Sequence, residues 1–129
     1  GKLVSYSQLI KFSENKNIYY ANHMYDHFNV KALNNNEIKE MYNNNINELN
    51  KFPNYINYFS FPNGNPNNAF TKSQLNYITN IFNPSKIFSC SRRFNFKNYK
   101  TLDRIAVSDN YSNLKDFEYL KIKTLLNFL

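Results

Sequence analysis

The stretch Asn63-Gly64-Asn65-Pro66-Asn67-Asn68-Ala69-Phe70-Thr71-Lys72-Ser73-Gln74 decides the predicted fold. Oxygen-bearing side chains at positions 1, 3, 5 and 12 of a loop of about twelve residues form the pattern that holds a calcium ion between two helices. These positions are taken here by amide side chains, those of Asn63, Asn65, Asn67 and Gln74. The spacing is present but the charged ligands are not. We therefore expect a helix–loop–helix unit that keeps its shape without binding the ion.

Hydrophobic spacing around this loop predicts helices. Thr71 and Gln74 have the spacing of a capping box, in which each side chain bonds the backbone N–H of the other residue at the start of a helix. Leu75 and Ile78 then follow at helical spacing, which predicts a helix over residues 71–82. The same criterion predicts further helices over residues 3–10, 18–30, 33–42, 53–61, 99–106 and 114–129.

Breaks between these segments set the expected fold class. The asparagines at 43–45 are expected to end one helix, and Pro53 to begin the next one. No segment shows the strict alternation of a half-buried strand. The sequence therefore predicts an all-α fold of paired helix–loop–helix units. We expect an N-terminal helical lobe over 1–61 and a C-terminal helical lobe over 62–129, or one compact domain.

Composition restricts the compartment and the partners. The net charge of +7 favours RNA, other phosphates, anionic lipid or acidic proteins as partners. Codon bias in an AT-rich genome raises the content of Lys and Asn, and it explains the same charge without a function. The single cysteine excludes an internal disulfide and predicts an intracellular, reducing compartment, either cytoplasmic or organellar. No apolar run is long enough to predict a membrane span.

Three segments carry a resemblance to a known family: residues 37–46, 69–75 and 114–120. They resemble the calmodulin superfamily, in particular the degenerate EF-hand myosin light chains of apicomplexan parasites. The resemblance implies a calcium-insensitive, non-catalytic light chain or adaptor without a cofactor, which grips an amphipathic helix of a larger protein. The residues it implies for the gripping surface are Met24, Met41, Phe59 and Leu75.

A basic segment favours a second function. Residues 91–100 interleave cations with aromatic side chains, which suits contacts with phosphates and stacking on bases. The alternative prediction is a small basic structural subunit of a large assembly, such as an organellar ribosome or a mitochondrial respiratory complex. Its contacts with RNA or acidic subunits would be made by Arg92, Arg93, Lys97 and Lys100.

Enzyme signatures are weak. His23 and His27 would share one face of the helix expected over 18–30, as two metal ligands do. A zinc site needs at least a third ligand, and none is close in the sequence. The chain has two glycines and no glycine-rich phosphate loop. We therefore predict a protein that is not an enzyme and has no metal site.

Overall fold

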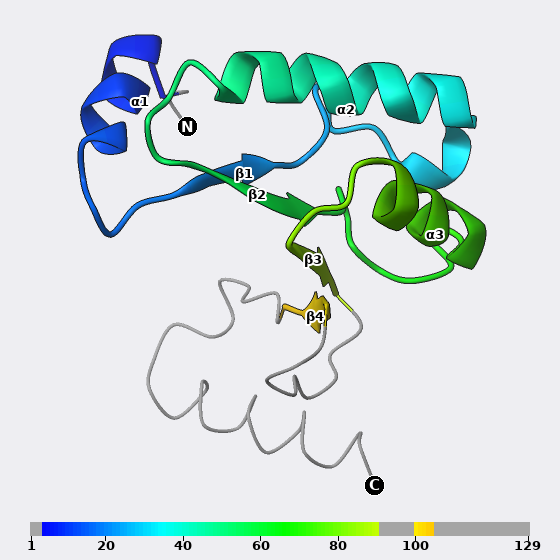
Figure 1. Cartoon of the computed structure of the whole chain (residues 1–129). Helices are drawn as coiled ribbons and strands as arrows, with labels where there is room; N and C mark the ends of the chain where they lie inside the picture. Colours follow the sequence, from blue (N-terminus) through cyan, green and yellow to red (C-terminus); the bar gives the residue numbers. More distant parts are fainter. Residues whose placement is uncertain (1–3, 91–99, 105–129) are drawn as a thin grey trace, which may run out of the picture.

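A computed structural model describes residues 4–90 and 100–104 (Figure 1). In chain order its elements are α1 (Tyr6–Ser13), β1 (Tyr20–Asn22), the 3-10 helix η1 (Val30–Ala32), α2 (Asn35–Leu49), β2 (Tyr55–Ser60), α3 (Lys72–Ile81), β3 (Lys86–Ser89) and β4 (Thr101–Asp103). The protein is an α/β protein. The prediction of an all-α fold, and with it that of paired helix–loop–helix units, is wrong.

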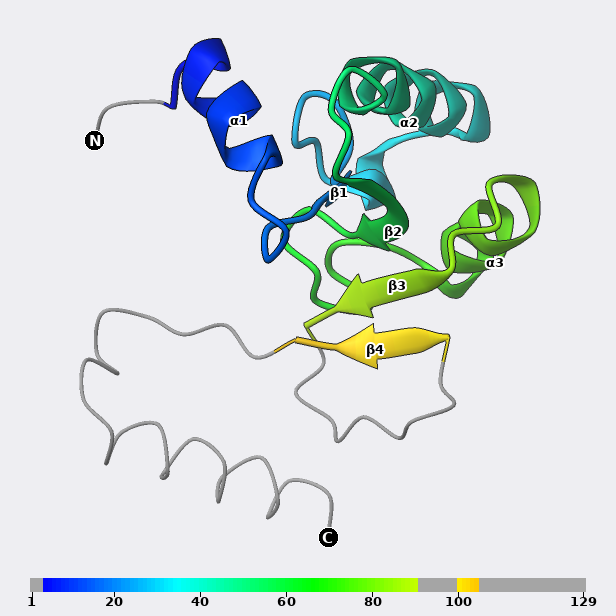
Figure 2. The same cartoon turned by 60° about the vertical axis from the view of Figure 1, so that its left-hand side comes forward.

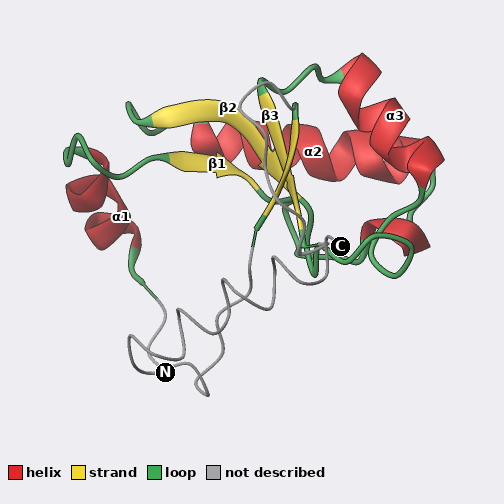
Figure 3. Cartoon of the chain, turned by 90° about the horizontal axis from the view of Figure 1, so that it is seen from below, coloured by secondary structure: helices red, strands yellow, loops and turns green. Residues whose placement is uncertain are grey.

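The described strands form one parallel sheet in the order β1-β2-β3-β4. Parallel neighbours need a crossover connection, and α2 and α3 supply the first two. Because such crossovers are right-handed and the strand order follows the sequence, both helices lie on the same face of the sheet (Figures 2 and 3). The boundary expected between residues 61 and 62 falls between β2 and β3, which are neighbouring strands.

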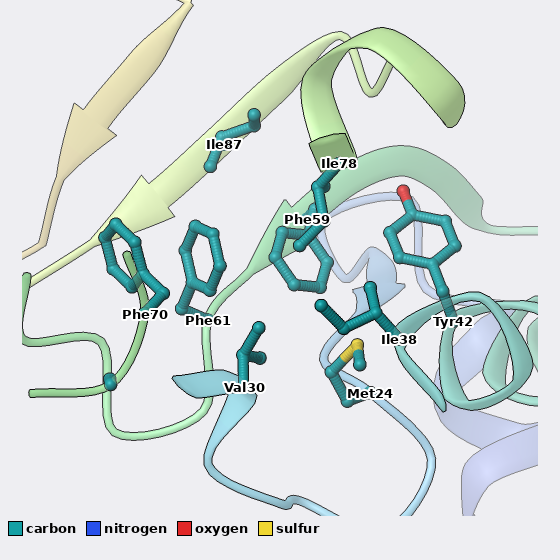
Figure 4. Packing of buried hydrophobic residues seen from close by; sticks show 10 residues of the cluster. Met24, Val30, Ile38, Tyr42, Phe59, Phe61, Phe70, Ile78 and Ile87 are labelled. Atoms are coloured by element: carbon teal, nitrogen blue, oxygen red, sulfur yellow. The ribbon is translucent and has the colours of Figure 1, made fainter. Parts of the chain in front are cut away.

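The core lies between this face and the helices (Figure 4). Phe59 of β2 and Ile87 of β3 meet Ile38 and Tyr42 of α2 and Ile78 of α3, and all five are fully buried. Ring stacking adds to this packing, with Tyr42 parallel to Phe82 at 3.9 Å and Phe61 parallel to Phe70 at 3.7 Å between ring centroids. The core is therefore largely aromatic and spans both helices and the two central strands.

Local capping signals locate the helices well. The capping box of Thr71 and Gln74 is present and α3 begins at Lys72, as predicted. Ser5 and Gln8 form another at the start of α1, which covers most of the helix expected over 3–10. The asparagines at 43–45 lie inside α2 instead of ending it. Asparagine is only mildly unfavourable within a helix, and burial of residues such as Ile38 and Tyr42 outweighs that cost.

Three predicted helices are replaced by strands. Residues 18–30 contain β1 and a loop, residues 53–61 contain β2, and residues 99–106 contain β4. Segment 55–60 is rich in aromatic and β-branched side chains, which favour strands, and it is paired on both sides. The helix expected over residues 114–129 lies outside the described residues.

The loop expected to resemble a calcium site joins a strand to a helix. Asn63 and Asn67 adopt positive φ angles of 59° and 69°, a conformation that asparagine tolerates in turns. Asn63, Asn65 and Asn67 are exposed in the connection from β2 to α3. Gln74 is buried in the first turn of α3, where its amide nitrogen donates to the carbonyl oxygens of Val30 and Leu33. The EF-hand-like interpretation of this loop is therefore wrong.

Two residues expected to grip a partner helix lie in the core. Met24 is 3% exposed and Phe59 is 0% exposed. Met41 and Leu75 are half-buried and pack against the same core. None of the helices in the described ranges is both long and apolar enough to cross a membrane.

Candidate functional site

Four polar side chains lie at the carboxyl ends of the four strands. They are His23 after β1, Ser60 at the end of β2, Cys90 after β3 and Arg104 after β4. Side chains alternate along a strand, and the neighbours Asn22, Phe59 and Ser89 are buried. Phe59 belongs to the core under the helices, and Asn22 donates to the carbonyl oxygen of Tyr42 in α2. This alternation therefore directs the four polar side chains named above toward the face of the sheet opposite the helices. We call this group the carboxyl-end site.

His23 is held by β2 in a defined tautomer. Its Nδ1 lies 2.7 Å from the carbonyl oxygen of Ser60, and because a carbonyl only accepts, Nδ1 carries the proton. The neutral ring therefore has Nε2 as an acceptor. Burial is the main cause that lowers the pKa of His23, and the charges of His27 and Arg104 lower it further against the opposing effect of the Ser60 bond. His23 is therefore mainly neutral at pH 7.

Arg104 has a side-chain nitrogen that no described residue bonds. One terminal nitrogen, Nη2, donates to the carbonyl oxygen of Phe61 at 2.8 Å. Its Nε is buried and has no hydrogen-bond partner within residues 4–90 and 100–104, and the same holds for the hydroxyl of Ser60. Leaving such a buried group unsatisfied costs about 1–3 kcal/mol. A ligand oxygen that displaced the groups covering these donors and accepted from them would remove that cost.

Gly64 brings Cys90 and Arg104 together. It lies in the loop after β2 with φ +65°, and its carbonyl oxygen accepts from the backbone N–H of Cys90 at 2.6 Å. A Cβ atom on Gly64 would lie 3.0 Å from Nη2 of Arg104 and 3.1 Å from Sγ of Cys90. Only glycine fits this approach without a shift of its neighbours. The thiol and the guanidinium group therefore line one compact region.

The layer beneath the site is polar and bonded. Ser89 is 3% exposed, and its hydroxyl donates to Oδ1 of Asp103 on the neighbouring strand. The backbone N–H of Arg104 also donates to the carbonyl oxygen of Ser89 at 2.8 Å. These bonds join the ends of β3 and β4. They hold Cys90 and Arg104 in a fixed relation to the sheet.

The two histidines do come together, although not on a helix. Their ring centroids are 4.9 Å apart with an interplanar angle of 69°, and His27 is exposed with φ 56°. Among the residues with described positions, no cluster of three or more metal-ligating side chains includes them. The pair adds two imidazoles to the rim of the carboxyl-end site.

The predicted basic residues lie elsewhere. Lys100 lies just before β4, at the opposite end of the sheet from Arg104, and its Nζ donates to the side-chain oxygen of Asn83 at 2.7 Å. Arg92, Arg93 and Lys97 are outside the described residues. Sequence reasoning did not single out Ser60 or Arg104. The available signal was that residues 55–60 and 86–89 are short runs with strand-forming side chains, each followed by polar residues or a turn.

Comparisons of the chain with protein-family models, with curated proteins and with solved structures gave no match. The resemblance to myosin light chains, the compartment and the partner class therefore stay predictions.

Proposed function

We propose that the chain is a ligand-binding α/β domain that holds a small anion, a phosphate or carboxylate group, at the carboxyl-end site. The observation that supports it best is the pair of buried, unpartnered donors, Nε of Arg104 and the hydroxyl of Ser60. Both donors lie at the carboxyl ends of the parallel strands.

The chemistry of the donors selects the ligand. A guanidinium group presents several N–H donors in a fork that matches the oxygens of a carboxylate or phosphate. Arg104 uses Nη2 for the backbone of Phe61, which orients the group, and its Nε has no partner among the described residues. The net charge of +7 draws anions toward the chain. Binding needs no turnover, so the proposal keeps the prediction of a protein that is not an enzyme.

Cys90 offers a direct test, because it is the only cysteine of the chain and lies half-buried in the site. We expect sulfate and acetate to slow alkylation of its thiol in a saturable manner. Choline chloride at equal ionic strength would have no such effect. Equal alkylation rates with and without the anions would refute the proposal.

Two charge-matched variants show which cation is responsible. Arg104→Gln should abolish the protection of Cys90, because it removes the charged donors. Lys100→Gln removes the same charge at the other end of β4 and should leave protection unchanged. Equal loss in both variants would mean that the anions respond to net charge and not to this site.

The predicted adaptor function has less support than the proposed anion-binding function. Met24 and Phe59 are buried in the core, so of the expected gripping residues only Met41 and Leu75 have partly accessible side chains. A subunit role in a large assembly depends mainly on residues outside the described ranges. Both stay predictions beside the proposed function.

A further inference from the structure

We propose that the ligand of the carboxyl-end site is a dianion, such as a phosphate monoester, and that it binds together with a proton taken up by the histidine pair. This inference rests on the proposed function and specifies its ligand.

The site contains one fixed cation and two groups that can become cations. Arg104 is charged at any accessible pH. His23 and His27 lie with ring centroids 4.9 Å apart, and His23 feels the charge of Arg104. His23 and Arg104 bond the consecutive carbonyl oxygens of Ser60 and Phe61 at the end of β2, which brings the imidazole pair and the guanidinium group around the same strand end.

The charges around His23 do not favour protonation of its ring. From β2 it meets the carbonyl oxygen of Ser60, and from α2 the side-chain oxygen of Asn45 accepts from its backbone N–H at 2.9 Å. The titratable groups that act on it are His27 from its own loop and Arg104 from the end of β4, and both oppose a positive charge on its ring. Asp103 is engaged by the hydroxyl of Ser89, and Asp26 is exposed.

A dianion reverses this balance. One negative charge is matched by Arg104, and the second favours an imidazolium on the histidine pair. The effect is reciprocal: if ligand binding favours the protonated ring, then protonation of the ring strengthens ligand binding. A carboxylate carries one charge and needs Arg104 alone. Affinity for a dianion should therefore rise as the pH falls, and affinity for acetate should stay nearly constant.

Sulfate is the appropriate probe because it stays dianionic over the whole range, whereas a phosphate monoester changes its own charge at about pH 6. We expect sulfate to bind roughly tenfold more tightly at pH 6 than at pH 8. Uptake of one proton changes affinity tenfold per pH unit, so this corresponds to an average uptake of about half a proton over the range. Acetate should change by less than about twofold over the same range. Protection of Cys90 from alkylation reports both affinities.

NMR titration of the imidazole signals identifies which ring takes up the proton, since the chain has only two histidines. We expect saturating sulfate to raise the titration midpoint of at least one ring, and acetate to raise neither. His23→Gln keeps an amide donor for the Ser60 carbonyl, and together with His27→Gln it should remove the pH dependence of sulfate binding. The NMR readout needs no variant, so it decides the question even if the double variant does not fold.

The outcomes separate the two proposals. If neither anion protects Cys90 at any pH, the proposed function itself fails. If both anions protect with affinities that do not depend on pH, the binding site stands and the proton-coupled dianion does not. Midpoints of both histidines that are unchanged by sulfate would overturn the inference in the same way.

Discussion

The side-chain amide of Gln74, in the first turn of α3, donates to the carbonyl oxygen of Val30 at 2.8 Å. The same nitrogen donates to the carbonyl oxygen of Leu33 at 2.9 Å, and the amide oxygen accepts from the backbone N–H of Thr71. One buried glutamine therefore caps α3 and attaches it to η1. A glutamine at this position serves packing and not ion binding.

Gln74→Glu tests this role. A carboxylate would lose both donated bonds and face two carbonyl oxygens, so we expect the free energy of unfolding to fall by about 2–3 kcal/mol in urea titrations. Calcium should not restore it, although a calcium loop would gain its missing ligand. Ser73→Glu, which adds the same charge on the exposed side of this turn, should leave stability nearly unchanged. Rescue of Gln74→Glu by millimolar calcium would contradict this assignment.

The hydroxyl of Tyr42 is buried and has no partner among the residues that the structure describes, and burial raises the pKa of this group. Tyr42→Phe keeps the stacking on Phe82 and removes the unsatisfied hydroxyl, so we expect stability to rise by about 1 kcal/mol. Tyr20→Phe is the matched control, because the Tyr20 hydroxyl donates to the carbonyl oxygen of Leu9 at 2.7 Å. Tyr20→Phe should lower the free energy of unfolding by about 1 kcal/mol. Changes of the same sign in both variants would argue against this reading.

Stability should also depend on pH through His23. Its pKa is lowered in the folded state, so the unfolded chain binds more protons in the window below the ordinary value of 6.5. The contribution of the neutral ring is complete above that value and is lost as the pH falls toward the folded pKa. Thermal unfolding from pH 8 to pH 5 should therefore show a loss of stability that is smaller in His23→Gln. An equal loss in this variant would assign the effect to other groups.

Gly64→Ala should disturb the site and the fold together. The new Cβ would crowd Arg104 and Cys90, and φ +65° is unfavourable for alanine. We expect a loss of about 1–2 kcal/mol in unfolding free energy, together with a changed alkylation rate of Cys90. Asn63→Gly, at the preceding position with φ 59°, relieves backbone strain and should change neither by much. Unchanged stability and reactivity in Gly64→Ala would mean that the loop adjusts freely.

The candidate site was harder to predict than the helices. His23 and His27 were expected to lie close together, and they do, but on a loop instead of a helix. Ser60, Cys90 and Arg104 are distant in the sequence, and no short motif links them. Their relation exists only because three strands pair in register, with Ser60 opposite Phe88 and Phe88 opposite Leu102. Sequence spacing carries no information about that register.

The sequence by itself determined the features whose partners lie within about four residues. The capping boxes of α1 and α3, the start of α2 and the turns around Asn63 and Asn67 are of this kind, because their hydrogen bonds close locally. Only the tertiary structure decided the fold class and the site. Strands of three to six residues gain stability from partners more than twenty residues away, as Phe59 does from Ile87, and that pairing overrides the helical spacing of residues 18–30 and 53–61.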